Sequence, residues 1–216
     1  MRKTGIGWAW VVTATLTAPG CLIKDVSQTV YLEPGGAVTW LVLERDVRSD
    51  GHTPQDRARE EADYFEAVAT GQHPVALAFS RLHPMGVRTA ILRAERPYSV
   101  LTEGRFTSLD QLMGLFASNL GVRASSTLDR HPGGVTWTFT VYDDPMSSVE
   151  DEAMNALADF LDGGRFVLVS GQFTSAAGLE LSDDQRTATL RVRAEVADDG
   201  SSQGPRRFSL TWMEGE

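Results

Sequence analysis

The sequence predicts an α+β protein, in which one antiparallel sheet of about seven or eight strands is packed on one face by three or four helices. Two observations carry this prediction. Several segments alternate between apolar and polar residues, as half-buried strands do, and others begin with a capping residue and continue with an apolar stripe at helical spacing. A Pro-Gly-Gly sequence also occurs twice just before a strand pattern, which favours β-hairpins.

The clearest strand covers residues 135–142, where four apolar residues alternate with hydroxyl-bearing ones. Such regular alternation is typical of antiparallel sheet with one solvated face. The pattern recurs at 187–196 and 208–213, and weaker versions occupy residues 28–33, 37–43, 87–94, 122–129 and 165–173. The polar, glycine-containing segment 197–207 is expected to be a mobile connection.

Three helices are predicted by their caps. Thr53 is the expected N-cap of the first helix, Pro54 suits its first turn, and Gly71 suits its end. The second helix is expected from Thr107 to Gly121 and the third from Ser148 to Gly163. The shorter apolar segment 74–82 is also expected to be helical.

Three tryptophans lie beyond the N-terminal segment, and each falls on the apolar face of an expected strand: Trp40, Trp137 and Trp212. One interpretation is that the three tryptophans form an aromatic surface that binds a ligand. The burial habits of tryptophan favour the other, a core between sheet and helices.

The two Pro-Gly-Gly turns suggest an internal repeat. Residues 32–40 and 128–137 both lead through this turn into Val-Thr-Trp, and each strand is followed by acidic residues and an expected helix. A duplicated ββα unit would produce this pattern, and so would two unrelated hairpins that use the same turn chemistry.

The first 20 residues have the layout of a secretory signal peptide. Arg2 and Lys3 precede an uncharged apolar stretch, and small residues follow. The stretch is shorter than the roughly 20 residues that a transmembrane helix needs. The only cysteine of the chain, Cys21, comes directly after Gly20. A single unpaired cysteine is uncommon in an exported protein.

The sequence Ala18-Pro19-Gly20-Cys21 resembles the signal of bacterial lipoproteins, although that family prefers Leu and then a small residue at the first two positions. The resemblance implies cleavage before Cys21 and fatty acyl chains such as palmitate on that cysteine. Leu22 is not the Asp that retains such lipoproteins in the inner membrane, so the resemblance implies the outer membrane, facing the periplasm, in a host that has one. The alternative is an ordinary signal peptide that is cut elsewhere. The rest of the chain resembles no characterised family.

This interpretation divides the chain into a signal peptide (1–20), a lipidated tether (21–27) and a single domain (28–216). The whole chain has a net charge of −9, and removing residues 1–20 leaves 18 basic against 29 acidic residues, or −11. This acidity argues against nucleic acid as a partner and against close contact with anionic lipid. The expected partners are the membrane, through Cys21, and another envelope protein.

The sequence contains no recognisable catalytic or metal-binding pattern. The histidines, which are His52, His73, His83 and His131, lack the i, i+4 spacing of a helical metal site. The acidic pairs lack the alternation of a calcium loop: Asp143-Asp144, Asp183-Asp184 and Asp198-Asp199. The nucleophile elbow and the glycine-rich phosphate loops are absent from the sequence. No cofactor is therefore expected, and enzymatic chemistry has no positive support.

The densest group of charges spans residues 44–50, between an expected strand and an expected helix. Arg45 and Arg48 could clamp a polar partner there, or the segment could be a network of surface salt bridges at a strand end.

These observations predict a lipid-anchored protein of the cell envelope that acts as a non-enzymatic protein-interaction or structural module. The alternative is a lipoprotein that binds a small or lipidic ligand between sheet and helices. An exposed sheet face with an apolar patch would favour the first function, and a deep apolar cavity would favour the second.

Overall fold

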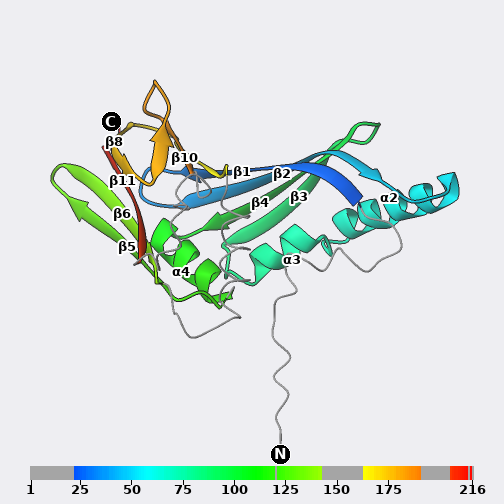
Figure 1. Ribbon diagram of the computed structural model, residues 1–216, viewed down its shortest axis with the longest axis horizontal. Coiled ribbons are helices and arrows are strands. Elements are labelled where there is room, and N and C mark those ends of the chain that lie inside the picture. The colour runs from blue at the N-terminus through cyan, green and yellow to red at the C-terminus, as the bar shows by residue number, and fades with distance from the viewer. Residues whose placement is uncertain (1–21, 120, 143–162, 191–204, 214, 216) are drawn as a thin grey trace, which may run out of the picture.

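The computed structural model describes residues 22–119, 121–142, 163–190, 205–213 and 215, and it is built mostly of β-structure (Figure 1). Within these ranges, eleven strands form two sheets, one of seven strands and one of four. The prediction of one antiparallel sheet packed by three or four helices is therefore wrong. The third expected helix (148–163), residues 191–196 of an expected strand and most of the connection 197–207 lie outside the described residues.

The seven-stranded sheet, called sheet A, is antiparallel except where β1 and β7 run parallel. Its strands in spatial order are β3 (Gly86–Arg93), β4 (Tyr98–Phe106), β2 (Val38–Ser49), β1 (Leu22–Leu32), β7 (Arg165–Leu168), β10 (Thr187–Leu190) and β9 (Leu179–Leu181).

The four-stranded sheet, called sheet B, is antiparallel throughout. Its strands in spatial order are β5 (Ala124–His131), β6 (Gly134–Val141), β11 (Arg206–Met213) and β8 (Gln172–Ala177). In Figure 1 sheet B lies at the left end of the molecule, away from the start of β1.

Two of the described helices, α2 (Pro54–Ala69) and α3 (Pro74–Ser80), lie on one face of sheet A, and the third, α4 (Leu109–Asn119), packs mainly against β5 and β6 of sheet B (Figure 1). The predicted cap of α2 is confirmed, because the Asp56 amide donates to Thr53 Oγ1 at 3.1 Å. The cap of α4 is Ser108 rather than Thr107, since the Gln111 amide donates to Ser108 Oγ at 3.4 Å. The helical segment expected at residues 74–82 is confirmed as α3.

Two local features explain why the sequence suggested a single sheet. The expected strand 165–173 is broken at Gly171, whose φ is 86°, and the chain passes there from β7 in sheet A to β8 in sheet B. Strand β4 was not expected at all. Its core face holds the polar Thr102 and the small Gly104, while the apolar Leu101 lies on the opposite face. The sequence of β4 therefore lacks the alternation of apolar and polar residues that predicts a strand.

Both expected hairpins exist, but they are not copies of one unit. In the β1–β2 hairpin the Glu33 amide donates to the Ala37 carbonyl oxygen and leaves a three-residue turn, whereas β5–β6 closes on His131 and Gly134 around a two-residue turn. The first hairpin lies inside sheet A and the second at one edge of sheet B. The shared Pro-Gly-Gly letters thus serve two different turns, and the duplicated ββα unit is wrong.

The core position of the tryptophans is confirmed, because Trp40, Trp137 and Trp212 are all buried. The Trp40 ring lies 5.1 Å from the Phe79 ring of α3, so it joins sheet A to the helices. Trp137 of sheet B lies 5.5 Å from Phe166 of sheet A, measured between ring centroids. Aromatic contacts therefore join the two sheets and the helices into one core.

The substitution Trp137→Ala should lower the free energy of unfolding by about 3–5 kcal/mol, since it leaves a large cavity between the sheets. Urea denaturation of the purified protein measures the change. The exposed residue Thr127 on the neighbouring strand is a control, and Thr127→Ala should change stability by less than about 0.5 kcal/mol. A similar small effect of Trp137→Ala would contradict the core assignment.

Candidate functional site

Helix α2 packs on the end of sheet A where β1 begins and forms a second, small core there. Its buried members are Val47 of β2, Val100 of β4, and Tyr64 and Val68 of α2. Leu22, the first residue of β1, packs against them. This small core positions both of the polar sites that follow.

A buried carboxylate lies beside this core. Glu44 is only 1% exposed and is contacted by groups from three other segments of the chain. The Tyr64 hydroxyl donates to Glu44 Oε2 at 2.8 Å, and Lys24 of β1 forms an ion pair with Oε1. His73 Nε2 lies 2.8 Å from Oε2, and His73 Nδ1 has no hydrogen-bond partner among the described residues.

The contacts keep Glu44 ionised. Burial raises the pKa of Glu44, but His73 and the positive charge of Lys24 lower it by more, so the pKa falls from its usual 4.5 to about 2. Burial and the neighbouring Glu44 charge raise the pKa of Tyr64 well above its usual 10.0. Tyr64 therefore stays protonated and acts as a hydrogen-bond donor to a fixed anion.

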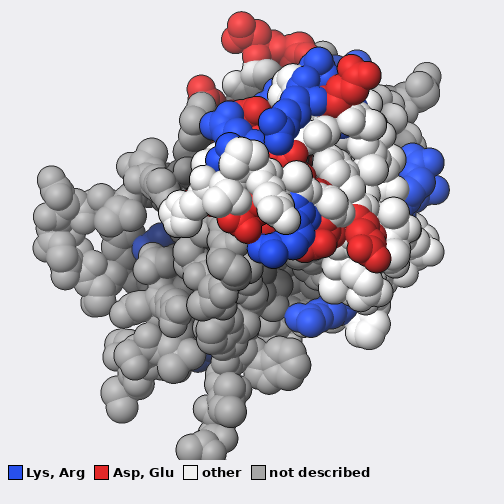
Figure 2. All heavy atoms as spheres, turned by 90° about the vertical axis from the view of Figure 1, so that its right-hand side faces the viewer, with Lys and Arg blue, Asp and Glu red and all other residues white. Residues whose placement is uncertain are grey.

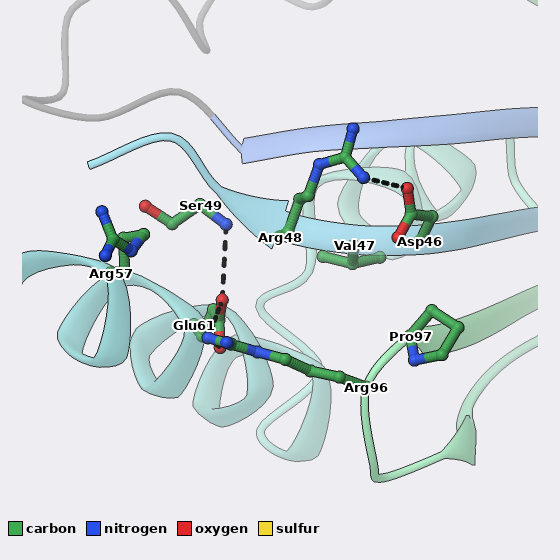
Figure 3. Close-up of a pocket in the computed structure, with 8 residues that line it drawn as sticks. All are labelled: Asp46, Val47, Arg48, Ser49, Arg57, Glu61, Arg96 and Pro97. Carbon is green, nitrogen blue, oxygen red and sulfur yellow. Dashed lines mark hydrogen bonds and ion pairs between the residues drawn. The ribbon is translucent and has the colours of Figure 1, made fainter. Parts of the chain in front are cut away.

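An open pocket of about 510 Å³ lies between α2 and the ends of β2 and β4 (Figure 3). The residues that line it are mostly charged: Asp46, Val47, Arg48, Ser49, Arg57, Glu61, Arg96 and Pro97. On the helix side, Glu61 is buried, and both of its carboxylate oxygens lie 2.8 Å from Arg96 Nη2.

The other charged side chains of the pocket are held by short local contacts. Arg48 forms an ion pair with Asp46 on the same strand (Figure 3). Arg57 donates to the carbonyl oxygen of Gly51 at 2.7 Å. Figure 2 views the end of the molecule that lies at the right in Figure 1, and blue and red side chains are intermixed on it. The pocket therefore offers charges of both signs to a polar ligand.

A second candidate site is the face of sheet A opposite the helices, called the outer face. Leu43 of β2 pairs with Leu101 of β4, and Leu101 pairs in turn with Ala90 of β3. Leu41 lies two residues before Leu43 on the same strand, so its side chain is on the same face. Paired residues point to the same side of a sheet, so these half-buried side chains form a row. None of the described helices covers this face (Figure 1).

Charged pairs border the apolar row. Arg88 Nη2 lies 2.9 Å from Glu103 Oε2, and Arg105 Nη2 lies 3.1 Å from Glu33 Oε2. An apolar centre with a charged border is the usual composition of a protein-binding surface.

The candidate residues from the sequence lie at separate places in the structure. The charged segment 44–50 does line the pocket in part, but Arg45 is not among the lining residues. His73 is buried beside Glu44. The other histidines are exposed, and the nitrogens of His131 contact Thr136 Oγ1 and the Gly133 amide within its own hairpin. Cys21, Asp143-Asp144 and Asp198-Asp199 lie outside the described residues.

The described ranges contain no group of three or more His, Cys, Asp or Glu side chains placed to share a metal ion. No described helix is long and apolar enough to span a bilayer. Asp184, from the remaining acidic pair, accepts a hydrogen bond from the Arg186 amide at 3.0 Å in the β9–β10 turn.

The buried acids could have been found by pattern. Glu44 follows Trp40 and Val42 at strand spacing, so the alternation places it on the core face. Glu61 precedes Tyr64 by three residues on α2, which places both on one side of the helix. Arg96 gave no such signal, because it comes from the β3–β4 turn and meets Glu61 only in space.

The stability of the protein should depend on pH through Glu44. A carboxyl group with a lower pKa in the folded chain stabilises the fold above its unfolded pKa, and this contribution is lost as the pH falls through the folded pKa. We expect up to roughly 3 kcal/mol to disappear between pH 4.5 and about 2. Urea denaturation across this range measures the loss, which should be smaller in Glu44→Gln.

The control is Glu103→Gln, which removes a more exposed carboxylate from the outer face. It should keep the pH dependence of the unmodified protein. If Glu44→Gln kept the same dependence as well, the pKa of Glu44 would not be the cause.

Comparison with known proteins adds little to this picture. No model of a protein family matches the chain, and no curated protein matches it. Among solved structures, the chain is similar to the folded domain of the Mycobacterium tuberculosis protein LppM, with 11% sequence identity over 89% of this chain and 91% of that chain. The TM-score is 0.36, and a score of this size does not establish a common fold.

Proposed function

We propose that the protein is exported, is anchored to a membrane of the cell envelope by a lipid on Cys21, and binds another protein through the outer face of sheet A. The observation that carries the binding function is the row formed by Leu41, Leu43, Leu101 and Ala90, which no described helix covers. The signal-peptide layout of residues 1–20 and the position of Cys21 support export and anchoring.

The apolar row explains why binding would be favourable. Removing apolar surface from water contributes roughly 25 cal/mol per Å², and the leucine side chains of this face lose their remaining exposure when a partner covers them. The bordering pairs, Arg88–Glu103 and Arg105–Glu33, supply polar groups at the edge of the contact. Such edge charges guide the choice of partner more than they add affinity.

The membrane concerned follows from the residue after the anchor. Leu22 is not the inner-membrane retention signal of bacterial lipoproteins, so a host with two membranes would carry the protein on the outer membrane, facing the periplasm. The lipid supplies the membrane affinity.

A second candidate function is the binding of a small ligand between sheet A and α2, where the pocket lies. Its lining of arginines and carboxylates favours a small polar ligand over a lipid chain. Native mass spectrometry of the purified protein would detect such a ligand as an added mass.

The anchor is tested by the substitution Cys21→Ser. Growth with a fatty-acid analogue should label the unmodified protein and leave Cys21→Ser unlabelled, because the acyl chains need the cysteine. The membrane fraction should lose Cys21→Ser, or the protein should accumulate with its signal peptide uncut. Equal labelling of both proteins would rule out the anchor.

The binding face is tested by a photo-crosslinking amino acid placed at Leu43 in living cells. We expect one discrete adduct with an envelope protein, since Leu43 lies at the centre of the apolar row. The neighbouring change Leu101→Asp should abolish the adduct by placing a charge in the contact.

The control position is Thr138, a half-buried residue of sheet B, where we expect no discrete adduct. Absence of an adduct at Leu41, Leu43 and Leu101 alike would contradict the proposed binding face, whatever the result for Cys21.

A further inference from the structure

The first strand begins within the segment that the sequence predicts to be a tether. Residues 22–27, which the sequence analysis assigned to the tether, belong to β1 and pair with β2. Leu22 pairs with Ser49 and Ile23 pairs with Arg48, and both partners line the pocket. Successive Cα atoms are about 3.8 Å apart, so a lipid on Cys21 would be attached one residue away from this end of the sheet.

We infer that the pocket end of sheet A lies against the bilayer and that its arginines bind the phosphate groups of lipid headgroups. The inference rests on the proposed anchor at Cys21. It replaces the expectation of a globule held away from the membrane surface by a tether. The occupant of the pocket is the headgroup layer of the membrane that carries the anchor.

The arginines suit this occupant. Arg48 and Arg96 expose 54% and 62% of their side chains, and each contacts its carboxylate partner through a single nitrogen. Each guanidinium therefore keeps N–H donors for a second acceptor, and its planar fork matches the oxygens of a phosphate. Ile23, which is 43% exposed beside Arg48, adds an apolar side chain to the same surface.

The side chains at the pocket decide this contact more than the charge of the whole chain does. The pocket lining holds three arginines against two acids, although the mature chain has a net charge of −11. Charges are screened over about 8–10 Å in physiological salt, so a headgroup responds mainly to the side chains that face it. Strand β1 has 11 residues, so its far end lies roughly 35 Å from the anchor.

This orientation also leaves the outer face free. The strands of sheet A would run away from the bilayer, and the row around Leu43 would face sideways into the surrounding compartment. Sheet B would lie at the far end, away from the headgroups (Figure 1).

The test measures how fast phenylglyoxal modifies individual arginines, with mass spectrometry as the readout. The mature chain, starting at Cys21 and unlipidated, is coupled through its only thiol to maleimide-bearing lipid in vesicles of phosphatidylethanolamine and phosphatidylglycerol. This coupling reproduces the anchor chemically, so the result does not depend on whether cells lipidate Cys21.

We expect the modification of Arg48 and Arg96 to slow at least severalfold on these vesicles relative to the free protein. The exposed Arg207 of sheet B is an internal control and should keep its rate. The matched variants Arg48→Gln and Arg207→Gln each remove one exposed positive charge, and only the first should weaken the protection of Arg96.

Several results would overturn the inference. Unchanged rates for Arg48 and Arg96 would show that this end does not meet the bilayer. If vesicles of an uncharged galactolipid slowed the modification of Arg48 and Arg96 equally, the bilayer would be shielding the arginines without binding them through phosphate. Equal protection of the free protein by inorganic phosphate would make the pocket a site for soluble phosphate rather than for the headgroup layer.

Discussion

The buried charge of Glu44 holds one end of the molecule together. Its carboxylate contacts Lys24 of β1, Tyr64 of α2 and His73 ahead of α3, so one side chain of β2 links four segments. A buried anion is costly unless it is paired and hydrogen-bonded, and these contacts offset that cost. The first residues of β1, the position of α2 and the walls of the pocket all depend on this arrangement.

The same arrangement connects the proposed anchor to the proposed functions. Lys24 fixes the beginning of β1, and Leu22 packs into the small core under α2. The membrane anchor and the pocket would therefore belong to one rigid end of sheet A. The outer face extends from that end along the strands, where a partner in the same compartment could reach it.

Part of the fold followed from local sequence alone. The alternation in residues 135–142 and 208–213 predicts two strands of sheet B, and Thr53 with Pro54 predicts the start of α2, because these signals depend on neighbours in the chain. The division into two sheets did not follow, since it depends on Gly171, where a Cβ would clash with the carbonyl oxygen of Met213. That contact joins residues far apart in sequence.

The candidate site, like the fold, was predictable only where its residues are neighbours in the chain. The dense charges of residues 44–50 mark the end of β2 in the sequence, and the structure has a pocket there. The partners of these charges come from α2 and from the β3–β4 turn, so the sequence could not show that Arg96 meets Glu61. The outer face was hidden for a related reason, because Leu101 becomes part of an apolar row only when β4 pairs with β2 and β3.

The most direct test of the rigid anchor end is hydrogen–deuterium exchange at the backbone amides of residues 22–27 in the mature protein. The amides bonded to β2 should exchange far more slowly than those of an unfolded peptide, and the substitution Glu44→Gln should speed their exchange more than that of β6 in sheet B. Exchange of residues 22–27 at the rate of an unfolded chain would show that they are a flexible tether, and it would contradict the account.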